Sequence, residues 1–165
     1  MSQTSLDIFD KTIQTTNIWL NEISAVIGPD RQVAWKILSV VLRKLRDRLP
    51  IGLAAHLGAQ LPILIRGAYY DQYKPSAQPG LCRTQEEFTA EVAEWLSDVR
   101  PVDPNLAIAA VLCCLDHHVD PGQIAKVKGA LPKQLRQMWE QSEMIAFPER
   151  GPDSMAEQRI TLEAV

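Results

Sequence analysis

The chain has 165 residues, of which 46% are hydrophobic and 22% charged, a composition typical of a folded globular protein. Its net charge of −3 argues against a dedicated nucleic-acid binder, whose domain is usually basic overall. No apolar run approaches the roughly 20 residues that span a bilayer, the first residues lack a signal-peptide pattern, and three cysteines make no disulfide framework, so we expect a cytoplasmic protein.

Four helices are expected before residue 74. Residues that step alternately by four and three predict the first amphipathic helix: Phe9, Ile13, Thr16, Leu20, Ile23 and Ile27. Gly28 and Pro29 end it, and Asp30 is placed to cap the second helix. Pro50 and Pro62 each precede a further short apolar helix.

Four more helices are expected after a linker. Residues 74–83 contain two prolines and a glycine, which is typical of a linker. Thr84 and Glu87 have the spacing of a capping box, in which each side chain accepts a hydrogen bond from the other's backbone amide. Asp103, Asp120 and Pro132 lie where the following helices should begin. Periodicity is lost near the end, so residues 143–165 are predicted to be a tail, with room for a short terminal helix.

An internal repeat organises these elements. Residues 41–69 align with residues 111–139 at a constant shift of 70, and eight of the 29 pairs are identical where about two are expected by chance. The pairs include Gly52 with Gly122, Pro62 with Pro132 and Arg66 with Arg136. We therefore predict an all-α fold of two tandem repeats, residues 1–73 and 84–142, each of about four helices and packed into one body.

The first copy also resembles a known family. The segments LRKLRDRL at residues 42–49 and AAHLGAQLPILIR at residues 54–66 are similar to the unit of the bacterial family catalogued as domain of unknown function 2267. The likeness covers roughly residues 5–141. It implies an all-α duplicated fold and no established activity, so the family supplies no catalytic residues.

A cysteine–histidine string in the second copy is the first candidate site. Cys113 with His117, and Cys114 with His118, are spaced i, i+4 and share helix faces. The repeat aligns them with Arg43, Lys44, Asp47 and Arg48, which we expect to be exposed, so the four residues should lie away from the core. A closed zinc site needs four ligands, and the missing ones would come from His56, Cys82, an acid or a second subunit. The alternative is a face that packs against a neighbouring helix or partner, with cysteine acting as a small apolar residue.

A basic helix is the second candidate site. Its four bases could contact phosphates. They are distributed around the helix, however, and the alternative is a solvated face. These bases are Arg43, Lys44, Arg46 and Arg48. The segment from residue 30 to residue 74 has a net charge of +5, so the rest of the chain has a net charge of −8.

Three tyrosines before the linker are the third candidate. Tyr69, Tyr70 and Tyr73 are interpreted mainly as packing residues. They could instead line a small-molecule cleft between the repeats or form a protein-binding surface, where aromatic residues are enriched.

No catalytic constellation emerges from these patterns, so we expect no enzyme and no cofactor. The leading hypothesis is a non-enzymatic interaction module that binds a protein partner or itself. The second is a small-ligand or metal-binding protein, and the third is a nucleic-acid-associated protein that uses the basic helix.

Overall fold

The computed structural model describes residues 6–150, and this range contains helices and turns but no β-strand. The prediction of an all-α fold is confirmed. None of the helices in that range is long and apolar enough to cross a membrane. The elements are α1 (Asp7–Ile27), α2 (Arg31–Arg46), α3 (Ile51–Gln60), α4 (Ile63–Tyr70), α5 (Gln85–Trp95), α6 (Pro104–His118), α7 (Pro121–Ala130), α8 (Lys133–Glu140) and α9 (Ser142–Ala146), with a 3-10 turn at Pro75–Ala77.

Local capping sets most of the helix ends as predicted. The Asp30 carboxylate accepts hydrogen bonds from the amides of Gln32 and Val33, both at 3.1 Å, and begins α2. Gly28 has a φ of +110°, a conformation that favours glycine, and turns the chain from α1 into α2. Asp103 and Asp120 cap α6 and α7 in the same way.

The capping box at the start of α5 is only half as predicted. The Thr84 hydroxyl accepts a hydrogen bond from the Glu87 amide at 3.2 Å. The Glu87 carboxylate accepts from the amide of Arg83 instead of that of Thr84. The Glu87 side chain therefore satisfies the amide one residue before the predicted one.

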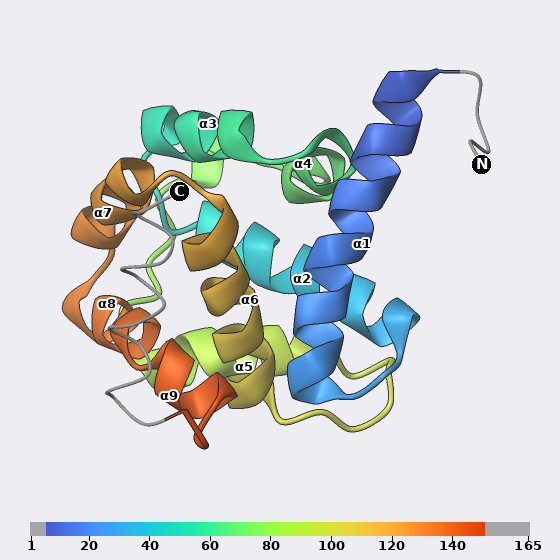
Figure 1. Ribbon diagram of the computed structural model, residues 1–165. Helices are drawn as coiled ribbons and strands as arrows, with labels where there is room; N and C mark the ends of the chain where they lie inside the picture. The colour runs from blue at the N-terminus through green and yellow to red at the C-terminus, as the bar shows by residue number, and fades with distance from the viewer. Residues whose placement is uncertain (1–5, 151–165) are drawn as a thin grey trace.

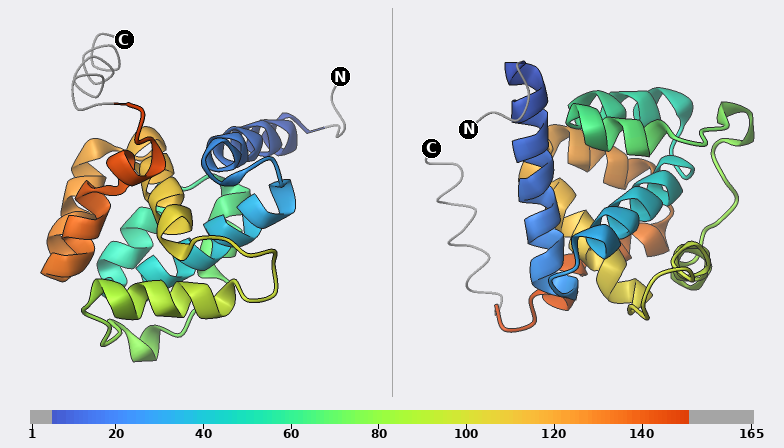
Figure 2. Two further views of the ribbon diagram at one scale, coloured as in Figure 1. Left: turned by 90° about the horizontal axis from the view of Figure 1, so that it is seen from below. Right: turned by 90° about the vertical axis from the view of Figure 1, so that its right-hand side faces the viewer.

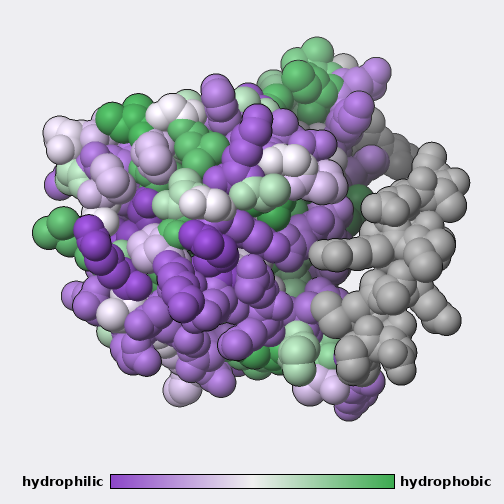
Figure 3. Space-filling model, turned by 90° about the vertical axis from the view of Figure 1, so that its left-hand side faces the viewer, coloured by the Kyte–Doolittle hydropathy of each residue, from purple (hydrophilic) through white to green (hydrophobic). Residues whose placement is uncertain are grey.

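The core lies where α2 and α6 meet in the middle of the molecule (Figure 1). α1 runs along one side of this pair and contacts α2, α4 and α6, while α5 contacts α2 and α6 from another side (Figure 2). The largest fully buried side chains are Trp19, Trp139, Tyr69 and Phe88. The face opposite α1 is largely hydrophilic, with hydrophobic residues scattered over its upper part (Figure 3).

A ninth helix extends the body beyond the predicted second repeat. α9 packs against α6, and Ala146 joins Ala109 and Cys113 in a small apolar cluster of its own. The predicted boundary at residue 143 therefore cuts through a helix that covers one side of α6. The remainder of the predicted tail, from residue 151, lies outside the described residues.

Candidate functional site

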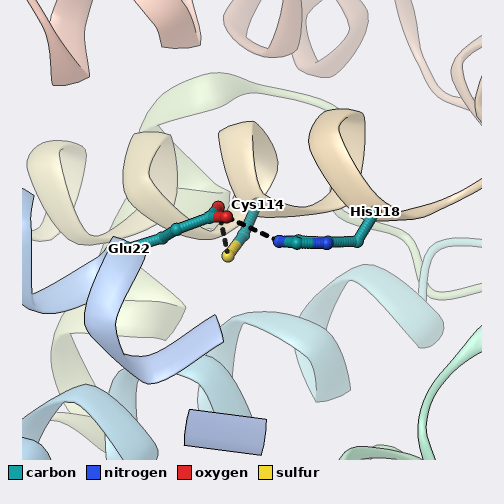
Figure 4. A group of neighbouring side chains, drawn as sticks. All are labelled: Glu22, Cys114 and His118. Carbon is teal, nitrogen blue, oxygen red and sulfur yellow. Dashed lines mark hydrogen bonds and ion pairs between the residues drawn. The ribbon is translucent and has the colours of Figure 1, made fainter. Parts of the chain in front are cut away.

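A cluster of three side chains joins α1 to α6. Glu22 comes from the buried side of α1, between the core residues Trp19 and Ile23. Cys114 and His118 come from the last turns of α6, where their i, i+4 spacing places both on the side that faces α1. The three side chains point toward one another between the two helices (Figure 4).

The Glu22 carboxylate is the centre of this cluster. Its Oε1 lies 2.6 Å from Nε2 of His118, and its Oε2 lies 3.3 Å from Sγ of Cys114 and 3.2 Å from Nδ1 of His117. One nitrogen, sulfur or oxygen atom from each of Glu22, Cys114 and His118 lies within 4.8 Å of the other two. A carboxylate can only accept, so all three neighbours donate to it.

The electrostatics of the cluster favour a charged Glu22. Burial raises the pKa of this carboxyl, but the hydrogen bonds from His117 and His118 outweigh burial and lower the pKa to about 2. The hydrogen bond to Glu22 raises the pKa of His117 above its ordinary 6.5, against the opposite effect of burial. Burial raises the pKa of Cys114 well above its usual range, and the nearby Glu22 charge adds to this effect.

Trp19 of α1 and Glu143 of α9 make further contacts with the residues around Glu22. The Trp19 ring stacks on His118 with centroids 5.0 Å apart, and the Trp19 carbonyl lies 3.6 Å from the Cys114 sulfur. Nε2 of His117 lies 3.8 Å from the carboxylate of Glu143, on α9. Contacts from both α1 and α9 therefore fix the positions of the two histidines of α6.

The expectation that all four residues of the cysteine–histidine string lie away from the core is wrong for the cysteines. Cys113 and Cys114 are both buried, whereas His117 and His118 remain partly exposed. The reason is that α1 covers the Cys114 side of α6 and α9 covers the Cys113 side. Cys113 contacts the Ser142 hydroxyl at 3.7 Å, and burial raises the pKa of its thiol to about 12. Cys113 therefore does not join the cluster.

The basic helix is also not the solvated face that we expected. Arg46 is buried, and its Nη1 donates to the carbonyl oxygens of Tyr69 at 2.5 Å and Asp71 at 2.8 Å. Arg48 is buried as well and pairs with Glu91 of α5. These two guanidinium groups stabilise the end of α4 and the approach of α5, so neither is presented to a phosphate.

The other two bases of this helix are partly exposed but also have partners. Arg43 donates to the Ala68 carbonyl and pairs with Asp71 at 3.0 Å. The Lys44 ammonium lies 4.8 Å over the Trp95 ring. The pocket beside these residues has a volume of about 50 Å³, far below the roughly 300 to 1,000 Å³ of typical ligand sites.

The three tyrosines divide between the core and the surface. Tyr69 is fully buried, and its hydroxyl donates to the Ala54 carbonyl at 2.6 Å, so its assignment to a cleft or partner surface is wrong. Tyr70 is partly exposed and packs edge-on against both Tyr69 and Tyr73. The Tyr73 ring lies under the Arg46 guanidinium at 4.7 Å.

Sequence reasoning found two members of the cluster and missed the third. An acid was one of four sources named for the missing ligands, and the structure identifies it as Glu22. His56 and Cys82 do not belong to this group. Glu22 lies 96 positions from His118, and no local pattern in α1 distinguishes it from an ordinary surface acid.

Most of the chain matches the model of a protein family. A family model described as "Uncharacterized conserved protein (DUF2267)" matches residues 16–138. That span includes Glu22, Cys114 and His118 and omits the first turns of α1. No curated protein matches the chain.

Proposed function

Since this chain belongs to the DUF2267 family of uncharacterized conserved proteins, whose description names no activity, we propose a function from the chain's own structure. The protein is a non-enzymatic helical interaction module that self-associates through the first turns of α1. One observation carries this proposal: the apolar stripe of α1 continues into its first turns, where Ile8, Phe9 and Ile13 are exposed within the described part of the chain.

The stripe can be followed along the helix. Thr16 and Leu20 are buried, while Phe9 and Ile13, two turns earlier on the same face, are 51% and 38% exposed. Ile8, on the flank of this face, is 56% exposed. The upper end of α1 extends past α4 in Figure 1, and Figure 2 shows it leading away from the body. Ile8, Phe9 and Ile13, which we call the α1 apolar face, thus form a helical surface in water.

A second copy of this chain is the occupant that the geometry favours. An apolar helical stripe can pair with the same stripe on a second copy, because a twofold interface uses the same surface patch of both copies. Pairing two such helices would remove both apolar faces from water at the same time. The family match begins at residue 16, so this surface belongs to the part of the chain outside the match.

The test compares two substitutions in the same helix. Phe9→Glu places a charge in the α1 apolar face, and Ile18→Glu places one on the side of α1 turned away from the core, at a residue that is also 51% exposed. We expect wild type and Ile18→Glu to show a concentration-dependent dimer in sedimentation-velocity ultracentrifugation and Phe9→Glu to remain a monomer. A wild type that is monomeric at every concentration, or a dimer that both variants disrupt equally, contradicts the proposal.

The non-enzymatic part of the proposal is supported by the state of the cysteines. The thiolate is the reactive form of cysteine, and burial raises the pKa of Cys113 and Cys114. Both are therefore protonated at neutral pH and covered by neighbouring helices. We also propose a cytoplasmic location, which the three free cysteines support.

We further infer that the scaffold is a tandem duplication, in which α1 to α4 correspond to α5 to α8. α3 and α7 have the same length and begin 70 residues apart, and so do α4 and α8. Across residues 51–70 and 121–140 the exposed, intermediate and buried positions coincide except at Gly58 and Lys128.

The helix contacts support the same inference. α2 touches α6 and α3 touches α7, so corresponding helices meet each other. α1 touches α6 as α5 touches α2, α2 touches α4 as α6 touches α8, and α1 touches α4 as α5 touches α8. Reciprocal contacts of this kind are those expected around a pseudo-twofold axis.

A further inference from the structure

We propose that Glu22, Cys114 and His118 form a binding site for a single transition-metal ion, with Zn²⁺ as the ion that best fits the three ligands. The site joins α1 to α6 (Figure 4). It does not depend on the self-association proposed above, because the α1 apolar face lies at the other end of α1.

The spacing of the ligand atoms is the first support. Zn²⁺ binds sulfur at about 2.3 Å and nitrogen or oxygen at about 2.0 to 2.2 Å, which places tetrahedral ligand atoms roughly 3.3 to 3.7 Å apart. In this structure the Cys114 sulfur lies 3.3 Å from Glu22 Oε2, and all three ligand atoms of the group lie within 4.8 Å of one another. His118 Nε2 lies 2.6 Å from Glu22 Oε1 because a proton lies between them, and a cation would take the place of that proton.

The chemistry of the ligands is the second support. A thiolate, an imidazole and a carboxylate together suit Zn²⁺ and related transition ions, whereas Mg²⁺ and Ca²⁺ prefer oxygen ligands alone. The side chains of Glu22 and His118 are 33% and 26% exposed, so solvent can supply the fourth ligand. The site then has three protein ligands and a fourth position that water can fill.

Neighbouring residues hold the ligands in place. His117 Nδ1 contacts Glu22 Oε2 at 3.2 Å, and the Trp19 ring stacks on His118. Such outer contacts orient metal ligands before the ion arrives.

Loading the site has a defined proton balance. Zn²⁺ binds the thiolate, so Cys114 releases its thiol proton to solvent as the zinc–sulfur bond forms. His118 binds through Nε2 as the neutral imidazole with a proton on Nδ1. The proton displaced from Nε2 therefore moves by way of solvent to Nδ1 of a neutral ring, or is released to solvent from a charged ring. Glu22 binds as the carboxylate and releases no proton. Binding of one ion therefore releases at least one proton and links α1 to α6.

The experiment is a titration of the chelator-treated full-length chain with Co²⁺, which reports its ligands by absorption. We expect one equivalent to bind, with visible bands of a tetrahedral ion and a near-ultraviolet band from thiolate-to-cobalt charge transfer. Zn²⁺ should displace the Co²⁺. Cys114→Ala should abolish the charge-transfer band, and His118→Gln should weaken binding at least roughly tenfold.

Matched controls lie nearby in the chain. Cys113→Ala removes the adjacent buried thiol and His56→Gln removes a histidine outside the cluster, and both should bind Co²⁺ as wild type does. Phe9→Glu should also bind normally, which separates this proposal from self-association. Should Cys114→Ala fail to fold by circular dichroism, Glu22→Gln and His118→Gln provide the test, because both side chains are partly exposed. Absence of binding by wild type, absence of the charge-transfer band, or equal binding by the cluster variants overturns the proposal.

Discussion

Glu22 and His118 lie 96 positions apart in the chain, yet Oε1 of the carboxylate is 2.6 Å from Nε2 of the imidazole. With His117 and Cys114 they make the polar connection between α1 and α6. Because this connection includes a glutamate and histidines, which gain or lose protons at different pH values, the stability of the metal-free protein should depend on pH.

The contribution of Glu22 and His117 to stability should be greatest between pH 4.5 and pH 6.5. The folded pKa of Glu22, about 2, lies below its ordinary 4.5, so its stabilisation is complete above pH 4.5 and is lost as the pH falls toward 2. The pKa of His117 is raised above 6.5, so its stabilisation is complete below pH 6.5 and is lost as the pH rises through the folded value.

Glu22→Gln isolates this contribution. We expect the variant to be less stable than wild type by about 1 kcal/mol inside that window, a modest figure because both side chains are about a third exposed. The difference should shrink on both sides of the window. Urea unfolding in the presence of a chelator, repeated at several pH values, measures it. A difference that does not change with pH would show that the contacts act without their charges.

Arg46→Ala should lower the free energy of unfolding by about 3 kcal/mol. The guanidinium is buried and donates to two carbonyl oxygens at the end of α4, and its removal leaves those acceptors unsatisfied. Arg83→Ala, at an exposed arginine, is the control and should change stability by less than about 0.5 kcal/mol. Urea denaturation gives both values. A loss at Arg46 as small as that at Arg83 would mean that water replaces the guanidinium.

Arg66 and Arg136 should respond alike to substitution, because they make corresponding contacts. Arg66 donates to the Leu61 carbonyl at 2.9 Å at the end of α3, and Arg136 donates to the Leu131 carbonyl at 3.2 Å at the end of α7. We expect each change to alanine to cost about 1 to 2 kcal/mol. Substitution by lysine instead of alanine should retain only part of this stability, since one ammonium group does not reproduce the planar, forked guanidinium group. Unequal losses in chemical denaturation would contradict the inferred correspondence of the two repeats.

The three thiols should react slowly in the folded protein. Cys82, Cys113 and Cys114 are all buried, and burial raises the pKa of each. Alkylation with iodoacetamide at neutral pH, followed by mass spectrometry, should modify all three in urea and leave Cys113 and Cys114 intact under native conditions. Rapid native labelling of Cys114 would show that α1 separates readily from α6.

The sequence by itself determined the helices α1 to α8 and where α2 to α8 begin. The side chains of Asp30, Asp103 and Asp120 cap amides two or three residues away, so these helix starts depend on a few neighbouring residues and can be predicted from them. The stripe of α1 and the short helices after Pro50 and Pro62 also depend on local spacing alone. For the same reason the residues of the cysteine–histidine string could be recognised before their surroundings were known.

Tertiary structure decided which of these residues are inside. The predicted repeat aligns Arg46 and Arg48 with Asp116 and His118, yet the two arginines are buried and the Asp116 and His118 positions are exposed. α1 and α9 cover the cysteine side of α6. Arg46 of α2 turns inward to the end of α4, and Arg48, just beyond α2, turns inward to α5. Burial depends on helices brought together from distant parts of the chain. Glu22 could therefore be placed beside Cys114 and His118 only by the packing of α1 on α6.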